Sequence, residues 1–338
     1  MERNLGVDLL KVISCFAVVV LHVSGIIAND INNSYTINHL LYYSAVLAVP
    51  MFFMVNGYFL LNKNILEYRY VFKKIANILM VILCWNLLLF ILKLISNKEI
   101  VNPIVELVKN LIQRGYFWQF WFFGALILIY IILPIIYKYF KDSRVAIIIT
   151  VIFIGISLIV DMLSLYRNFN GQSIIQINVP QTFRIWTWFS YYFLGGVLGK
   201  KQIMEFLLNK ISKNLNIAIV IISFLVINFY EYFIGKNLYN NTFAEYFYDN
   251  IFIFLYVISV FLFIYRININ NSTLINLCSN NIMGIYIIHI SLIKLFKHFY
   301  KFDTQIYNIC LILIVFISSL VVSIIISKIP IIRKVIKL

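Results

Sequence analysis

Ten segments of about 20 mostly apolar residues follow one another along this chain, separated by short polar or charged breaks. A helix of that length crosses the hydrocarbon core of a bilayer. The segments lie at 5–27, 40–62, 75–97, 118–138, 145–165, 182–200, 214–234, 250–266, 279–298 and 306–328. We therefore expect an all-α membrane protein of about ten transmembrane helices, forming a single integral-membrane domain over residues 1–338.

The composition excludes a water-soluble protein. Hydrophobic residues make up 62% of the chain and charged residues 12%, against about 45–50% and about 25% in soluble domains. Intrinsic disorder needs low hydrophobicity, and no polar stretch is long enough for a large catalytic domain outside the membrane. The widely spaced Cys15, Cys84, Cys278 and Cys310 indicate buried thiols rather than a metal site or a disulfide framework. The chemistry of the chain is thus expected inside the bilayer.

The basic residues predict the orientation. Lys and Arg number 28 and Asp and Glu 13, which gives a net charge of +15. Cytoplasmic loops of membrane proteins collect Lys and Arg, so this excess calls for no nucleic acid. With the N-terminus inside, cytoplasmic segments hold 17 basic residues and external segments 9, and the loop Asn29–Asn38 holds none. We expect both termini in the cytoplasm and a first helix that is retained, since no cleavage-site pattern follows it. The segment Ile104–Leu111 has the pattern of an interfacial amphipathic helix.

The first segment carries three ionisable residues, Asp8, Lys11 and His22. Lys11 and His22 are eleven positions apart, about three turns and 20°, so they share a helix face and lie roughly 16 Å apart along it. Asp8 and Lys11 have the spacing of an ion pair. Buried ionisable groups are expensive and mark function by default. The alternative is that Lys11 extends to the cytoplasmic headgroups and His22 hydrogen-bonds a neighbouring helix.

Polar residues in later segments are less specific. Asn56 beside Gly57 suits either close helix packing or a cavity wall. Lys73 and Lys74, which precede the third segment, could bind phosphates or only follow the positive-inside rule. Asp161 and Arg184, in adjacent segments, are interpreted as a structural ion pair without a chemical role.

The order of these residues resembles the integral-membrane acyltransferase family three, whose members acylate sugars and other envelope molecules. That family's first helix similarly carries Asp, a base three residues later and His eleven residues after that. The resemblance continues over nearly the whole chain, in Phe52–Tyr58, Trp121–Leu126, Phe193–Gly196 and Gly284–His289. The chain departs from the family at Asn56, where Ser is usual. It also has Lys74 and Asn77 where many sugar acyltransferases have two arginines, and it has no fused hydrolase-like domain.

The resemblance implies roles for individual residues. His22 would be the catalytic base or acyl relay, because a neutral imidazole can take the proton of an acceptor hydroxyl. Lys11, with Lys73 and Lys74, would hold acyl-CoA from the cytoplasmic side. Asp8, Asn56, Trp121, Tyr286 and His289 would support the site, and His289 either takes part directly or is a helix-packing donor.

The expected activity is transfer of an acyl group, most simply acetyl, from acyl-CoA to a hydroxyl of an envelope polysaccharide or lipid-linked sugar. Acyl-CoA is then a co-substrate, and no permanently bound cofactor, metal or nucleic acid is expected. The expected location is a bacterial plasma membrane, with multiple passes. A polytopic transporter or polysaccharide-export protein would also need intramembrane Asp, Lys and His, and a non-catalytic assembly factor is a third reading.

Overall fold

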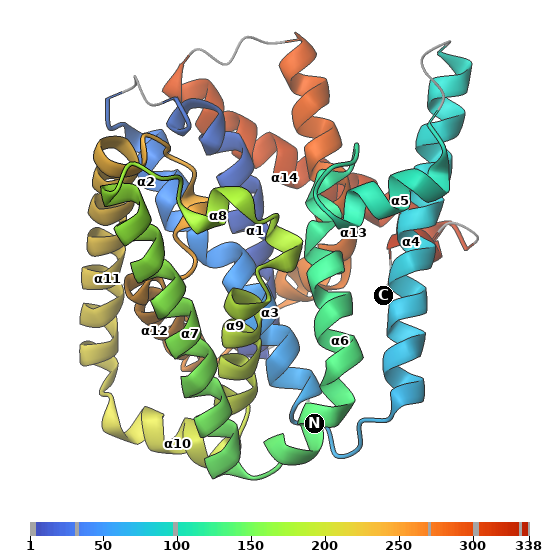
Figure 1. Ribbon diagram of the computed structural model, residues 1–338. Coiled ribbons are helices and arrows are strands. Elements are labelled where there is room, and N and C mark those ends of the chain that lie inside the picture. Colours follow the sequence, from blue (N-terminus) through green and yellow to red (C-terminus); the bar gives the residue numbers. More distant parts are fainter. Residues whose placement is uncertain are drawn as a thin grey trace.

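The computed structural model describes residues 5–30, 34–96, 101–269, 272–299, 304–330 and 333–336. Over these residues the chain forms α-helices joined by short loops and single helical turns, with no β-strand (Figure 1). The prediction of an all-α polytopic membrane protein is therefore confirmed.

Among the described residues, eight helical segments are long and apolar enough to cross a membrane. They are α1 (Leu5–Ala28), α2 (Ile37–Ser44) continued by α3 (Ala48–Leu60), α4 (Tyr68–Ile95), α6 (Trp121–Phe140) with the turn before it, α7 (Ser143–Phe169), α11 (Lys213–Ile234) continued by the turn Gly235–Tyr239, α13 (Thr273–Phe299) and α14 (Gln305–Lys328). Each coincides with one of the predicted segments.

The two remaining predicted segments form shorter helices, α9 (Ile185–Leu198) and α12 (Ile251–Tyr265). At 1.5 Å per residue, helices of this length span only about 21–23 Å, less than the hydrocarbon core. Every residue of α9 from Thr187 to Leu198 is buried. Gln181, Thr182 and Arg184, which directly precede α9, are buried as well, so these polar residues lie within the protein rather than in hydrocarbon.

Three short helices complete the described fold: α5 (Pro103–Leu111), α8 (Ile175–Asn178) and α10 (Lys201–Lys210). The predicted interfacial helix is α5, and it begins where the Asn102 side chain accepts a hydrogen bond from the Ile104 amide (2.9 Å) and where Pro103 needs no partner. At the lower end of the molecule in Figure 1, α10 lies across the ends of the long helices.

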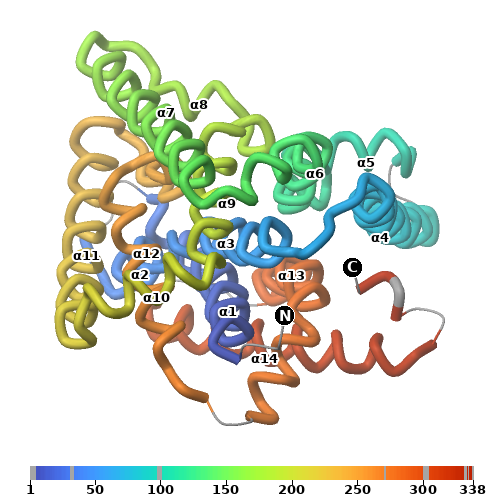
Figure 2. The backbone as a smooth tube through the Cα atoms, turned by 90° about the horizontal axis from the view of Figure 1, so that it is seen from below, coloured from blue at the N-terminus to red at the C-terminus, as the bar shows by residue number. Residues whose placement is uncertain are grey.

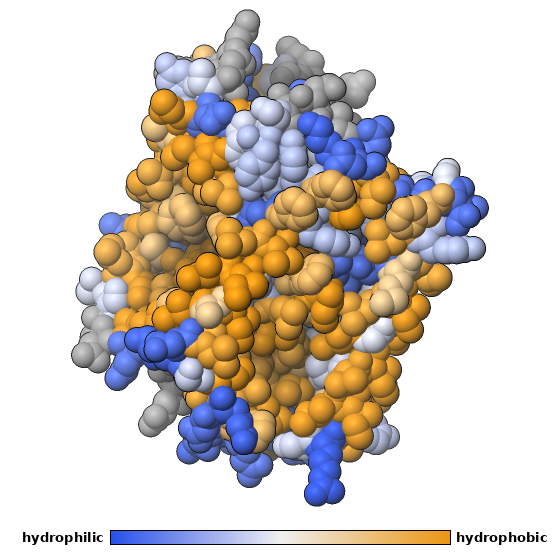
Figure 3. Space-filling model, turned by 90° about the vertical axis from the view of Figure 1, so that its left-hand side faces the viewer, coloured by the Kyte–Doolittle hydropathy of each residue, from blue (hydrophilic) through white to orange (hydrophobic). Residues whose placement is uncertain are grey.

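The outer helices present apolar side chains to the surroundings. On α7 these include Ile148, Val151, Ile152, Ile159 and Met162, all exposed. Figure 3 shows a face on which apolar residues form a broad band with polar residues gathered toward its ends. A band of this kind would promote aggregation in water, whereas it matches the hydrocarbon region of a bilayer.

The interior is built around α1, α3, α9 and α13, which lie near the middle when the molecule is viewed from below (Figure 2). The closest approach is between α3 and α9. A methyl group on Gly57 would lie 1.8 Å from the Tyr192 carbonyl oxygen, and one on Gly195 would lie 1.9 Å from that of Met54. Glycine at both positions lets the two backbones touch, which fixes how α3 is rotated and where Asn56 points.

Candidate active site

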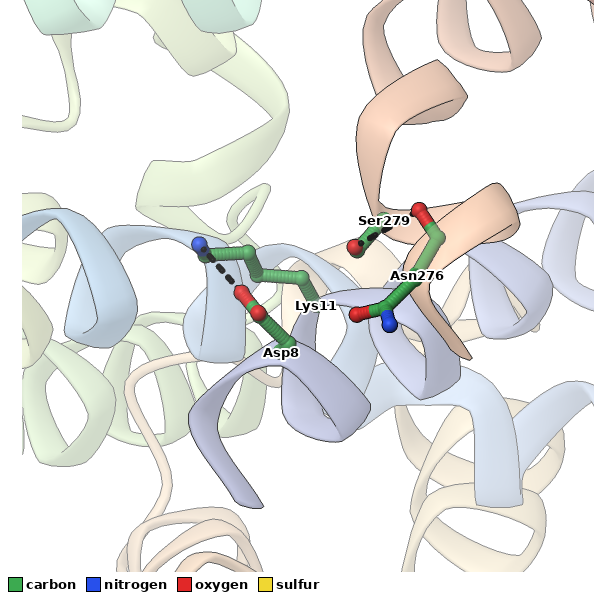
Figure 4. Close-up of polar contacts among 4 residues, drawn as sticks. All are labelled: Asp8, Lys11, Asn276 and Ser279. Atoms are coloured by element: carbon green, nitrogen blue, oxygen red, sulfur yellow. Dashed lines mark hydrogen bonds and ion pairs between the residues drawn. The ribbon is translucent and has the colours of Figure 1, made fainter. Parts of the chain in front are cut away.

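Asp8 and Lys11 form the predicted ion pair near the start of α1, with Lys11 Nζ 3.0 Å from Asp8 Oδ1. The carboxylate is the more buried partner, and the ammonium group also lies 4.6 Å from the centre of the Phe59 ring. Asn276 and Ser279 of α13 lie beside this pair (Figure 4), and the Ser279 hydroxyl donates to the Asn276 carbonyl (3.2 Å). The pair thus holds the lysine head group where α1 meets α3 and α13.

Lys11 is part of the wall of a cavity of about 810 Å³ among α1, α3, α4, α6 and α13, which we call the inner cavity. Lys63 and Lys74 also line it, and their ammonium groups lie 3.5 Å and 5.6 Å from the centre of the Tyr70 ring. Asn56, Ser279 and Asn280 add polar groups to the wall. Apolar and aromatic side chains line much of the rest, among them Phe52, Val55, Phe122, Phe123, Leu126, Met283 and Tyr286. This cavity therefore combines cations that can bind phosphates with an apolar wall.

A second cavity, of about 420 Å³, contains His22 and is called the outer cavity. Its wall includes aromatic side chains from three separate stretches of chain, namely Tyr42, Trp118, and Phe243 with Tyr246. Asn29, Gln113, Glu245 and Lys297 add polar groups. Such a mixture of aromatic faces and a few polar groups is typical of a site for a small polar ligand.

Glu245 is held in the outer cavity by the chain around it. Its Oε2 accepts a hydrogen bond from Gln181 Nε2 (3.1 Å), and its main-chain carbonyl accepts one from Arg184 Nη1 (2.8 Å). Burial raises the pKa of the Glu245 carboxyl, while Gln181 and Arg184 oppose that shift in part. The loop that carries Glu245 is therefore fixed beside the cavity rather than free in solvent.

His22 lies between the inner and outer cavities. Its ring meets the edge of Trp118 at a centroid distance of 5.2 Å, and the His289 ring lies 5.4 Å away at an interplanar angle of 27°. Tyr286, one turn before His289 on α13, lines the inner cavity and has its ring 5.9 Å from that of His289. A chain of rings thus connects the inner cavity to His22, whose own side chain faces the outer cavity.

A model of the family described as an acyltransferase domain matches residues 4–328, nearly the whole chain. The chain belongs to this acyltransferase family. No curated protein and no solved structure shows significant similarity to it. An acyltransferase needs a place for an acyl donor and a place for an acceptor. Within the described residues, no group of three or more His, Cys, Asp or Glu side chains could hold a metal ion.

The acyltransferase brings Lys74 to the inner cavity but not Lys73, which is exposed. Successive residues of a helix point about 100° apart, and on α4 this rotation turns Lys73 to the exposed side while Lys74 lines the cavity. Lys63 takes the place predicted for Lys73. In the sequence, Lys63 is one of the 17 basic residues on the predicted cytoplasmic side, and its place five residues after the motif Phe52–Tyr58 is the signal that could have indicated this position.

Trp121, expected to support the site, is buried away from both cavities of the acyltransferase and packs against Trp188 at a ring distance of 5.1 Å. The tryptophan that contacts His22 is Trp118, which precedes α6. The single helical turn Trp118–Phe120 separates the two tryptophans, and their indole rings point into different parts of the bundle.

The sequence left two interpretations open for Asn56 and Gly57, close helix packing and a cavity wall, and the structure shows both. Gly57 provides the close packing against α9, whereas Asn56 lines the inner cavity of the acyltransferase. The Asn56 amide donates to the Phe52 carbonyl (2.9 Å), and its oxygen accepts a hydrogen bond from the Tyr130 hydroxyl (3.1 Å). The amide therefore orients Tyr130, a further residue of the cavity wall.

The predicted ion pair between Asp161 and Arg184 is wrong. Asp161 accepts a hydrogen bond from the Asn250 amide (3.0 Å), and Arg184 donates to the main-chain carbonyls of Gln176, Val179 and Glu245 at 2.6–3.1 Å. Neighbouring segments in the sequence do not fix how each helix is rotated, so the two side chains point to different partners. In the acyltransferase, Arg184 instead secures the loop beside the outer cavity.

Proposed function

We propose that this acyltransferase moves an acetyl group from acyl-CoA in the inner cavity to a hydroxyl of a sugar in the outer cavity. The acceptor is an envelope polysaccharide or a lipid-linked sugar, and the protein resides in a bacterial plasma membrane with the inner cavity toward the cytoplasm. The observation that carries this proposal is the place of His22, which faces the outer cavity and is joined to the inner one through His289 and Tyr286.

The inner cavity supports acyl-CoA as the donor. Lys11, Lys63 and Lys74 offer ammonium groups to its phosphates, and Tyr70 offers a ring next to two of them. Phe122 and Phe123 extend the cavity toward Tyr286. The arm of acyl-CoA that carries the thioester, which is narrower than its nucleotide part, would lie there. Lysines act here as point charges, so they compensate for the missing arginine at Asn77 in charge but not in bidentate geometry.

The outer cavity supports a sugar as the acceptor. Trp118 and Tyr246 offer aromatic faces for the apolar side of a sugar ring, and Asn29, Gln113 and Glu245 offer partners for its hydroxyl groups. His22 lies in the same wall, so a hydroxyl bound here can reach the imidazole.

In the reaction, the neutral His22 imidazole accepts the proton of the acceptor hydroxyl while the hydroxyl oxygen attacks the thioester carbonyl. The new C–O bond forms and the C–S bond breaks. The proton then passes from His22 to the departing CoA thiolate, so protons balance over the cycle and no further reactant is needed.

The decisive experiment replaces His22 by Ala and measures consumption of acetyl-CoA and labelling of a cell-envelope glycan fraction by the purified protein in liposomes. We expect turnover to fall about 10²–10⁴-fold, because that is the usual contribution of a positioned proton-transfer group. His22→Gln should be little better, since an amide cannot cycle a proton.

His298→Ala is the matched control, because His298 is an exposed histidine on α13 that lines neither cavity. Near-normal turnover of folded His22→Ala would overturn the role of His22. If the wild-type protein consumes no acetyl-CoA with any glycan fraction, the donor and acceptor proposed here are wrong.

A further inference from the structure

We propose that His289 is a positioning residue for His22: its Nε2 accepts a hydrogen bond from His22 and thereby aims the other His22 nitrogen at the acceptor hydroxyl. This inference rests on the proposed role of His22 and adds to it a residue that acts through His22 rather than on the substrate.

The His289 side chain has a defined tautomer. Its ring is 0% exposed, and Nδ1 lies 3.1 Å from the Ile285 carbonyl oxygen one turn earlier. A carbonyl oxygen can only accept, so Nδ1 carries the proton and the neutral ring presents a lone pair at Nε2. The hydrogen bond to Ile285 also fixes the plane of the ring.

The Nε2 atom of His289 is buried without a hydrogen-bond partner among the residues that the structure describes. Leaving a buried acceptor unpaired is energetically unfavourable, so its presence calls for a reason. The nearest candidate partner is His22, whose ring lies 5.4 Å away by centroids and only 27° from parallel. The proposal requires that the His22 side chain turn so that one of its ring nitrogens points toward Nε2.

The remaining neighbours of His22 confine its ring without orienting its protons. Trp118 meets it edge to face, and the titratable groups that share its cavity are Tyr42, Glu245, Tyr246 and Lys297. No hydrogen bond joins any of these to the imidazole in the described part of the chain. His289 is thus a neighbouring ring that offers His22 an unpaired hydrogen-bond acceptor among the described residues.

The proposed bond becomes stronger during the reaction. When His22 takes the acceptor proton it becomes a cation, and its N–H donates to His289 Nε2 in a charge-assisted hydrogen bond. An interaction that strengthens in the transition state raises kcat rather than substrate affinity. His289 neither gains nor loses a proton: the proton moves from the hydroxyl to His22 and then to the CoA thiolate.

Two substitutions separate this role from simple helix packing. His289→Asn keeps an N–H near the position of Nδ1 and can still donate to Ile285, but it has no acceptor at the Nε2 position. His289→Gln reaches the Nε2 position with an amide oxygen that can accept from His22. If His289 only packs, Asn should be the better substitute, whereas positioning of His22 makes Gln the better one.

The experiment measures kcat, both KM values and melting temperature for each variant with acetyl-CoA and the glycan fraction. We expect His289→Asn to lower kcat about 10–100-fold with little change in either KM, and His289→Gln to recover part of the loss. In a His22→Gln background, His289→Asn should cause no further loss, because its effect passes through His22. Equal or higher activity of Asn over Gln, or a further loss in that background, overturns the proposal.

A measurement on the unmodified protein covers the case in which both variants unfold. Nitrogen NMR of histidine-labelled protein with acetyl-CoA bound should show coupling across an N–H···N bond between His22 and His289, and its absence overturns the proposal. Failure of this NMR test leaves a loss of activity in His22→Ala unaffected. The proposed function itself fails only if the wild-type protein consumes no acetyl-CoA with any glycan fraction.

Discussion

At the scale of single residues, the position of Lys11 is set by three neighbours. Asp8 holds its ammonium group at 3.0 Å, Phe59 offers a ring at 4.6 Å, and the side chain lines the inner cavity beside Lys63 and Lys74. A lysine that only extended to the headgroups would not need a buried carboxylate partner. The ion pair therefore favours a binding role over that of a topology anchor.

Lys11→Ala should raise the KM for acetyl-CoA more than the KM for the acceptor, because it removes a cation from the donor side only. Lys11→Arg should keep most of the activity, and Asp8→Asn should show a milder form of the same defect, since the lysine stays charged but less well oriented. Steady-state kinetics with each substrate varied in turn gives both KM values. A fall in kcat as well would mean that Lys11 also positions the thioester.

Lys73→Ala is the control for this series, because Lys73 is an exposed lysine next to Lys74 that lies outside the inner cavity. We expect Lys73→Ala to behave as the wild type and Lys63→Ala to resemble Lys11→Ala. An unchanged KM for acetyl-CoA in Lys11→Ala would assign the lysine to topology alone.

The site was predictable where it depends on one helix and not where it depends on several. Asp8, Lys11 and His22 lie on α1, and the period of the helix alone fixes their relative directions. Two other positions depend on how neighbouring helices are rotated and where they begin. Trp118 rather than Trp121 contacts His22, and Lys63 rather than Lys73 lines the inner cavity. That information resides in packing between distant segments, which periodicity along one segment does not contain.

At the scale of elements, the predicted segments all correspond to helices because apolar runs of membrane length have few other structures available. Two helices, α9 and α12, are shorter than the others. Nearly all of α9 and most of α12 are buried against other parts of the protein, so contact with the bilayer does not alone set their length. The α3–α9 contact then links fold to site, since Gly57 sits against Tyr192 while the adjacent Asn56 lines the inner cavity.

Gly57→Ala should destabilise the protein, because the added methyl group would lie 1.8 Å from the Tyr192 carbonyl oxygen and must push α3 from α9. Overpacking of this kind costs about 1–3 kcal/mol, and a clash with backbone leaves little room to relax. Thermal unfolding in detergent measures the change, and the KM for acetyl-CoA should rise with it as Asn56 shifts.

Gly155→Ala provides the matched comparison, since a methyl group at that helical position of α7 meets nothing within 4 Å. This variant should be as stable as the wild type or gain about 0.5–1 kcal/mol from the better helix former. Equal melting temperatures for Gly57→Ala and Gly155→Ala would show that α3 and α9 do not approach as closely as described.

At the scale of the whole molecule, the reaction depends on direction across the membrane. The inner cavity lies beside the chain between α3 and α4, where Lys63 is located, whereas the outer cavity lies beside the loops that follow α1 and α11. Alternating helices place these two groups of loops at opposite ends of the bundle (Figure 1). The excess of basic residues in the loops on the Lys63 side predicts that this end of the bundle faces the cytoplasm.

Single cysteines placed in a background without the four native ones test this orientation. Ser34 and Asn240 are exposed in loops on the side of the outer cavity, and Ser212 is exposed in the loop between α10 and α11 on the opposite side. In intact cells, Ser34→Cys and Asn240→Cys should react with an impermeant thiol reagent and Ser212→Cys should not. Permeabilised cells should give labelling at all three positions, which controls for access. Labelling of Ser212→Cys in intact cells, with the other two protected, would place the inner cavity outside the cell, where no acyl-CoA is available, and the donor and acceptor assignments would fall together.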